Sequence, residues 1–147
     1  MANLLDRFNK QVKGSQNKIY DYIPKITAKG DFKRISDLNV IINSWNNILM
    51  TPRRTYINDP EYGSDLHLQV FEPADALTSE RIETEIVERL RHYDDRASII
   101  SMNVFTFKNQ KGFEVDIQVD FKGEKGDLSI TFTDSSYREL LEKGSLT

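Results

Sequence analysis

The stretch from Phe113 to Phe121 alternates between apolar and polar side chains without a break. Its odd-numbered positions are all apolar, and its even-numbered positions are Glu114, Asp116, Gln118 and Asp120. Successive side chains of a β-strand point to opposite faces, so this pattern predicts a strand with one buried and one solvated face. Such a strand needs hydrogen-bonded neighbours and a covering layer. This requirement constrains the fold more than any other feature of the chain.

Both neighbouring strands are indicated by the same period of two. Before the central strand, apolar residues alternate with polar ones from Ile100, and residues 109–112 form a turn. After it, residues 122–126 form a second turn, and Leu128, Ile130 and Phe132 line one face of a third strand. The sequence therefore predicts an antiparallel meander with one apolar face.

Two amphipathic helices are predicted to cover that face. An apolar stripe of period 3.6 runs from Leu38 through Ile41, Trp45 and Leu49, and Pro52 ends this helix. A second helix buries Ile82, Ile86 and Leu90. We expect Ser36 or Asp37 to cap the first helix, and Thr78 or Ser79 the second. The predicted fold class is α+β, with a three-stranded antiparallel meander covered by two amphipathic helices.

The flanking segments divide the chain into three parts. Residues 1–35 begin with a helical pattern that Gly14, Pro24 and Gly30 interrupt, which predicts a short N-terminal helix and an extended arm. That arm either folds back on its own core or docks on a partner chain. Residues 36–133 form the α+β domain, and 134–147 carry a short C-terminal helix and tail. The apolar segment Leu66 to Phe71 has no clear period.

Composition limits the classes of function. A chain of 147 residues with 38% hydrophobic residues is long enough for one domain with a core of its own. Its formal net charge of -3 gives no basic field for nucleic acid, and it has no cysteine for disulfides or thiolate ligands. No run approaches a membrane span, and the first residues lack a secretory signal. We expect no direct contact with nucleic acid or membrane.

Reaction chemistry has little support in the sequence. His67 and His92 lie in different segments, and neither has an acid at metal-binding spacing. A glycosidase would need two carboxylates, and Glu61, Glu72 and Asp75 are candidates. In a chain with 23 acidic residues such a coincidence carries little weight. We therefore expect no catalytic residue, no metal and no cofactor.

Several features follow one another in a fixed order between residues 36 and 133. The first helix ends in the sequence Ile-Leu-Met-Thr-Pro at 48–52, and Asp-Pro-Glu-Tyr-Gly follows at 59–63. Val-Phe-Glu-Pro occupies 70–73, and the second helix ends in an aromatic-acid-x-Arg corner at 93–96, before the amphipathic hairpin. In this order the chain resembles the baseplate wedge family of contractile phage tails. That family includes the sheath initiator, once described as a lysozyme, and the equivalent subunit of type VI secretion systems.

The resemblance implies a structural subunit with partner-binding residues and no active site. The family's Glu-Pro-Arg corner is present here as Asp94, Asp95 and Arg96, so the arginine is retained. The family usually has a glycine and an arginine after its Thr-Pro, where this chain has Arg54 and Tyr56. We expect these five residues and Glu72 to bind partners. A guanidinium at such a corner can hold a partner's carboxylate in two hydrogen bonds, although it can also be an ordinary charge at a helix end.

The implied partners are other baseplate wedge proteins and the tail sheath protein, with the tail tube as a further candidate. The implied location is the baseplate of the virion tail, and the host cytoplasm during assembly. A meander has open edges to which another chain can add a strand, at 97–108 or at 128–133. Two alternatives remain: a freestanding adaptor that binds a peptide by strand addition, and a muramidase that cleaves peptidoglycan.

Overall fold

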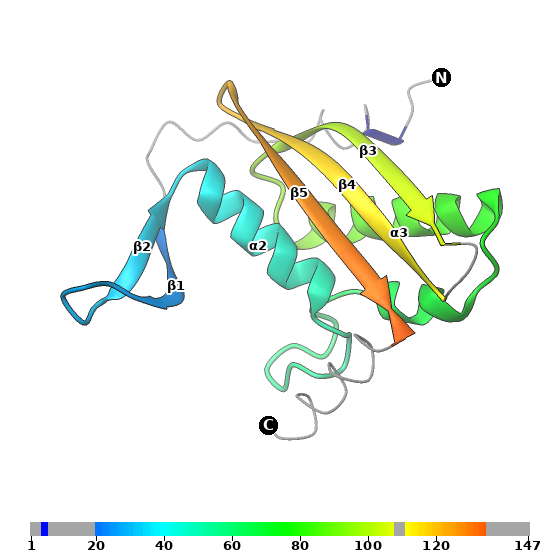
Figure 1. Ribbon diagram of the computed structural model, residues 1–147, viewed down its shortest axis with the longest axis horizontal. Coiled ribbons are helices and arrows are strands. Elements are labelled where there is room, and N and C mark those ends of the chain that lie inside the picture. The colour runs from blue at the N-terminus through cyan, green and yellow to red at the C-terminus, as the bar shows by residue number, and fades with distance from the viewer. Residues whose placement is uncertain (1–3, 6–19, 108–110, 135–147) are drawn as a thin grey trace.

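The computed structural model describes residues 4–5, 20–107 and 111–134 of the chain (Figure 1). Within these ranges the elements are strands and helices in the following order: β1 (Tyr20–Ile26), β2 (Phe32–Ser36), α2 (Leu38–Met50), the 3-10 helix η1 (Leu66–Phe71), α3 (Ala76–Tyr93), β3 (Ser98–Thr106), β4 (Gly112–Phe121) and β5 (Glu124–Thr133). None of the helices in the described ranges has the length and apolar character needed to cross a membrane.

The predicted meander is confirmed as an antiparallel sheet of order β3-β4-β5. Val115 of β4 lies opposite Val104 of β3 and Ile130 of β5. Pairing between β4 and β5 runs without interruption, and a tight turn with positive φ at Lys122 and Gly123 joins the two strands. Pairing between β3 and β4 has a register shift between Ile99 and Ser101, which marks a β-bulge.

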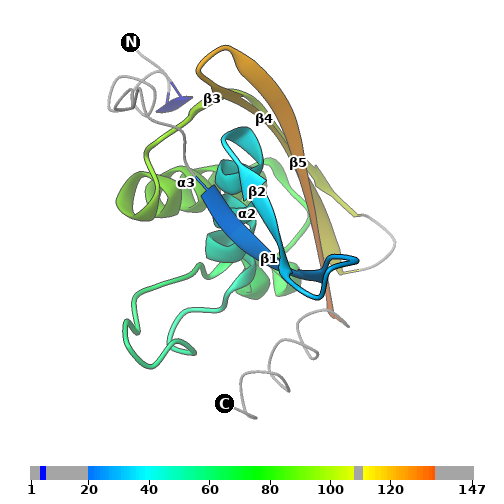
Figure 2. The ribbon, with the colours of Figure 1, turned by 90° about the vertical axis from the view of Figure 1, so that its left-hand side faces the viewer.

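Helices α2 and α3 cover one face of the sheet, which gives the predicted two-layer α+β sandwich (Figure 2). Helix α2 packs mainly against β5, and α3 packs against β3. Trp45 of α2 and Ile86 of α3 are fully buried, and all five apolar residues of the alternating β4 pattern are in the same core. The apolar faces predicted for the two helices, β4 and β5 are therefore the faces that meet. On β3 the prediction was wrong at its start, because the register shift leaves Ile99 buried and Ile100 43% exposed.

One helix begins at a predicted cap residue, and the other begins earlier than predicted. Asp37 occupies the N-cap of α2, but with φ of 51° its side chain accepts no capping hydrogen bond. Helix α3 starts one turn earlier than expected, because the carboxylate of Asp75 accepts a hydrogen bond of 2.8 Å from the backbone N–H of Thr78. An aspartate satisfies a free N–H at a helix start as well as serine or threonine does. Thr78 therefore lies inside the helix rather than at its cap.

The segment expected to be an extended arm forms a hairpin where it is described. Strands β1 and β2 pair antiparallel, with Tyr20 opposite Ser36. The backbone N–H of Thr27 donates to the carbonyl of Asp31 across the turn, and Gly30 has φ of 86° there. Figure 1 shows this hairpin beside the start of α2, clear of the sandwich. The rest of the predicted N-terminal helix, beyond residues 4–5, and the predicted helix at 136–143 lie outside the described residues.

Candidate partner-binding site

The corner between α3 and β3 is built around an ion pair within the chain. Asp94, which is 5% exposed, accepts two hydrogen bonds of 2.7 Å from the guanidinium of Arg96. The backbone N–H of Arg96 also donates to Asp94. These hydrogen bonds raise the pKa of Arg96, so the guanidinium stays charged. Its side chain is still 36% exposed. Asp94 therefore holds the guanidinium in a fixed orientation at the corner, with part of the Arg96 side chain open to solvent.

A row of three tyrosine rings leads from this corner to the loop after α2. The ring centroids of Tyr62 and Tyr93 are 5.2 Å apart, and those of Tyr56 and Tyr62 are 5.4 Å apart. Burial raises the pKa of Tyr62, and the neighbouring charge of Asp94 adds to the rise. The structure thus links Tyr56 through Tyr62 to Tyr93, the residue before Asp94, although 38 positions separate Tyr56 from Asp94 in the chain.

Arg53 anchors the same loop from inside. Its guanidinium donates to Glu61 and, over 2.8 Å, to Asp65. Both hydrogen bonds raise the pKa of Arg53. The neighbouring Arg54 is exposed and adopts φ of 69°, in the left-handed region that favours glycine. The position at which the family usually has glycine is therefore one where the backbone favours it.

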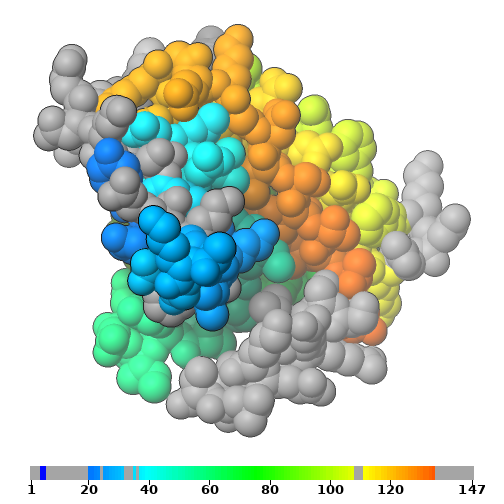
Figure 3. Space-filling model, turned by 60° about the vertical axis from the view of Figure 1, so that its left-hand side comes forward, coloured from blue at the N-terminus to red at the C-terminus, as the bar shows by residue number. Residues whose placement is uncertain are grey.

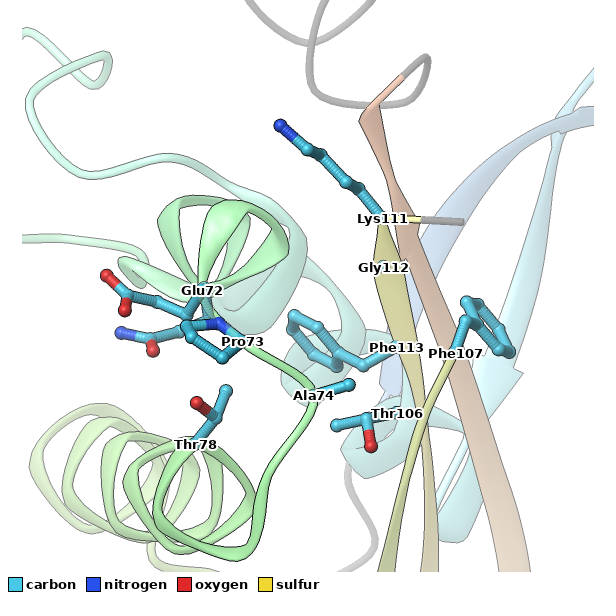
Figure 4. A pocket seen from close by; sticks show the side chains of 10 residues that line it. Glu72, Pro73, Ala74, Thr78, Thr106, Phe107, Lys111, Gly112 and Phe113 are labelled. Atoms are coloured by element: carbon cyan, nitrogen blue, oxygen red, sulfur yellow. The ribbon is translucent and has the colours of Figure 1, made fainter. Parts of the chain in front are cut away.

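Glu72 is separated from the other predicted site residues. It precedes α3, whereas Asp94 and Arg96 follow that helix of 18 residues, which is about 27 Å long. Glu72 lines a cavity of about 300 Å³ between the start of α3 and the β3–β4 end of the sheet. Figure 4 shows its carboxylate pointing away from Lys111 on the opposite wall. The predicted partner-binding residues therefore lie at two separate ends of α3.

Described residues do not place the candidate glycosidase acids together in that cavity. Glu72 is the only acid among its described lining residues. Glu61 pairs with Arg53, and hydrogen bonds from Thr78 lower the pKa of Asp75, which favours its charged form. A glycosidase needs two converging carboxylates, one of them with a raised pKa. Nor do the described residues contain a cluster of three metal-binding side chains.

One hydrogen bond shows which residues of the two edge strands direct their main-chain N–H and C=O groups away from the sheet. The N–H of Phe107 donates to the carbonyl of Gly112, so this pair is of the hydrogen-bonded type. Because the pair types alternate along antiparallel strands, alternate residues of β3 and β5 direct their N–H and C=O groups away from the sheet. On β3 these residues are Met102, Val104 and Thr106, and on β5 they include Lys125, Asp127, Ser129 and Thr131.

Sequence reasoning singled out the corner and the sheet edges as candidates but did not single out Ile57 in the loop after α2. Ile57, next to Tyr56, is 80% exposed. It lies between two polar segments and belongs to no periodic pattern, so only its exposure singles it out. The row formed by Tyr56, Tyr62 and Tyr93 was also absent from the prediction, because its members come from three separate positions in the chain.

Comparison with solved structures supports the fold. A crystal structure described as a tail lysozyme from Geobacter sulfurreducens matches with a TM-score of 0.56. The match covers 65% of this chain and 88% of that one, at 23% sequence identity. An identity this low shows a shared fold only.

Comparison of sequences identifies the family. The baseplate wedge protein gp25 of Enterobacteria phage T4 is 31% identical over 105 residues, which cover 69% of this chain and 80% of that protein. The sequence model of the family described as "Baseplate wedge protein gp25" matches residues 36–125, from the end of β2 to the start of β5. The protein therefore belongs to the baseplate wedge protein gp25 family.

Proposed function

We propose that the protein is a structural subunit of a contractile tail baseplate, which joins other wedge proteins and initiates sheath assembly by strand addition. Family membership supports the baseplate role. The proposal of strand addition rests on one observation. The helices cover one face of the sheet, and within the described residues its two edge strands have no further strand beside them. An open edge offers unpaired N–H and C=O groups to a strand from another chain.

Strand β5 is the edge that we propose to accept the sheath. It pairs with β4 over ten positions without a register shift. Lys125, Asp127, Ser129 and Thr131 direct backbone groups outward at regular intervals, and all four side chains are exposed. The incoming strand would therefore find a straight ladder. Strand β3 is a poorer template, because a bulge increases local twist and interrupts the ladder.

Helix α2 packs against β5 and could also contact a strand added beside it. Figures 1 and 3 show α2 running alongside β5. A Cβ atom at Gly126 would lie 2.9 Å from side-chain carbons of Leu38 and Ile42, so helix and strand are in close contact there. Two packed helices span about 20 Å, whereas three strands span about 14 Å. The helical layer is therefore wide enough to support a fourth strand, and Leu38 and Ile42 are still partly exposed.

The Asp94–Arg96 corner is the proposed contact with other wedge proteins. Asp94 orients the guanidinium and compensates its charge, while more than a third of the Arg96 side chain remains open. A fixed guanidinium can recognise a carboxylate or a main-chain carbonyl of a partner. No bond-breaking step is proposed. A freestanding peptide-binding adaptor would use the same edge, but would stay outside tail particles.

The test replaces outward-facing N–H groups on each edge. Ser129→Pro removes one donor from the free side of β5 and leaves the β4 ladder in place, whereas Val104→Pro does the same on β3. We expect Ser129→Pro to reduce sheathed tails at least tenfold in particles counted by electron microscopy, while baseplates still contain the protein. Val104→Pro should have a much smaller effect.

Ser129→Ala is the matched control, because it removes the same hydroxyl and keeps the N–H. It should support normal sheath assembly, and both Ser129 variants should melt close to the wild type. Val104→Pro also removes a partly buried side chain that packs against the core, so its particles are counted at a temperature at which melting shows it to be folded. Normal sheaths with Ser129→Pro and absent sheaths with Val104→Pro would move the contact to β3. Normal sheaths on both proline variants would reject strand addition, and absence of the wild-type protein from baseplates would reject the baseplate role.

A further inference from the structure

The loop between α2 and η1 carries an isoleucine that the fold leaves in contact with solvent. Ile57 is the most exposed large hydrophobic residue in the described part of the chain, and Tyr56 beside it is 48% exposed. Burying an isoleucine side chain contributes about 1.5–3 kcal/mol. In the isolated chain this contribution is left unused. The adjacent apolar pair forms a small protrusion of two side chains.

The loop that carries this pair is closed by hydrogen bonds at several levels. At its base, Pro52 and Ser64 form an isolated bridge, and the hydroxyl of Ser64 donates to the buried carbonyl of Leu49 over 2.6 Å. Nearer the tip, the N–H of Arg54 donates to the carbonyl of Pro60 over 2.8 Å. These bonds hold the two arms of the loop together on both sides of Arg53.

Side chains strengthen the same closure. Arg53 bridges Glu61 and Asp65, and Tyr62 packs against Tyr93 of α3. At Gly63 a Cβ atom would lie 2.2 Å from the carbonyl oxygen of Thr51, so the two arms are in direct contact. A loop held in this way loses little conformational entropy on binding, which favours affinity for a partner.

We propose that Ile57 and Tyr56 insert into an apolar pocket of a neighbouring baseplate subunit, with Arg54 binding a carboxylate at the pocket rim. Arg54 is exposed and forms no ion pair with the described residues, so its charge is available to complement an acid. Tyr56 also connects this contact to the Asp94–Arg96 corner through the tyrosine row. The proposal rests on the baseplate role and adds a second, apolar anchor to it.

The hairpin provides a matched control for this proposal. Ile26 of β1 is 74% exposed, almost as much as Ile57. It follows the register shift of the hairpin, and no ion pair among the described residues holds that position. Ile57→Ser and Ile26→Ser therefore remove the same side chain at similar exposure from two different surfaces, and each should leave the melting temperature almost unchanged.

The experiment uses the full chain co-expressed with the other wedge subunits of its baseplate. Ile57→Ser should lower the amount of protein that co-purifies with the wedge complex at least tenfold, and Ile57→Val should restore most of it. Ile26→Ser should co-purify as the wild type does. Arg53→Met loosens the loop without changing its tip, and we expect an intermediate loss with an increased dissociation rate.

Three results would overturn the proposal while leaving the baseplate role intact. The first is normal co-purification of Ile57→Ser in a complex that contains the wild-type protein. The second is equal loss with Ile26→Ser, because general surface apolarity would then be the cause. The third is a concentration-dependent dimer of the isolated chain that Ile57→Ser abolishes in sedimentation, because the occupant would then be a second copy. Absence of the wild type from the complex would instead reject the proposed function.

Discussion

The β1–β2 hairpin and the β3–β5 meander are both antiparallel, but most apolar side chains of the meander are buried, whereas the hairpin leaves large ones exposed. In the meander, Ile117 and Ile130 are at most 4% exposed beneath the helices. In the hairpin, Tyr22 and Ile26 are 63% and 74% exposed. Local turn chemistry is similar, because a positive-φ glycine closes the turn in each case. The difference arises because helices α2 and α3 cover one face of the meander.

This comparison shows that strand formation and burial are separate problems. A two-stranded hairpin alone is marginal in water, whereas three strands with an apolar face against helices form a stable unit. The hairpin is joined to the sandwich by its direct continuation into α2 and by a hydrogen bond of 3.2 Å from Asn43 to Asp21. Apart from Ser36, the hairpin also lies outside the segment that matches the family, residues 36–125.

The largest expected effect is the difference in stability loss between a core substitution in the meander and a surface substitution in the hairpin. Ile117→Ala leaves a cavity between β4 and the helices, and we expect it to lower the free energy of unfolding by about 2–5 kcal/mol. Ile26→Ala in the hairpin should change it by less than about 0.5 kcal/mol. Urea denaturation monitored by circular dichroism measures both. Equal losses would show that the hairpin is part of the same core.

A smaller effect is expected at the corner that lies between the regions. Arg96→Ala leaves the buried carboxylate of Asp94 without its guanidinium, at an expected cost of about 1–3 kcal/mol. The negative charge of Asp21 on the hairpin also acts on Arg96, but more weakly than Asp94 does. Asp21→Asn should therefore cost less than about 0.5 kcal/mol.

Thermal melting would measure these changes, and co-purification would measure wedge binding. Arg96→Ala should remain folded and bind the wedge complex less. Complete unfolding would assign Arg96 a purely structural role. A loss for Asp21→Asn as large as that for Arg96→Ala would contradict the weak coupling of the hairpin to the sandwich.

The smallest effect is a pH dependence confined to the sandwich. His67 of η1 is 8% exposed, and burial lowers its pKa below the usual value of about 6.5. Its contribution to stability is therefore complete above pH 6.5. It decreases as the pH falls from there toward the folded-state pKa, because the unfolded chain binds the proton more readily.

The expected slope from His67 is at most about 1.4 kcal/mol per pH unit within that window. Unfolding of the wild type and of His67→Gln, followed between pH 7.5 and 5.5, should show the slope only in the wild type. An identical slope in both proteins would assign the pH dependence to other groups. The hairpin contains no histidine and should not respond in this range.

Much of the sandwich was predictable because each element has a long periodic signal. The nine residues from Phe113 to Phe121 and the stripe through Trp45 each match one period only, so strand and helix could be told apart. Leu66–Phe71 is too short for such a signal and forms a 3-10 helix. The cap of α3 was misplaced because Asp75, Thr78 and Ser79 are all good capping residues.

The candidate site was predictable only in part. Arg96 stood out through its place at the corner, but its partner Asp94 could be recognised as buried only in the folded chain. Glu72 was grouped with Arg96 by family resemblance, and the length of α3 separates them. Ile57 has no distinguishing sequence context, so its role as a candidate anchor depends on its exposure in the fold.

The sequence by itself determined the two covering helices, the three strands of the meander, most of the faces that they bury and the resemblance to the family, because periodicity and local motif order are properties of neighbouring residues. It did not determine the β1–β2 hairpin or η1, which have no such periodic signal. Tertiary structure alone decided which edge of the sheet lies beside α2, which charges pair, and which apolar side chains stay outside. These outcomes depend on contacts between residues far apart in the chain. Three rings from Tyr56, Tyr62 and Tyr93 form one row only because the loop closes against α3.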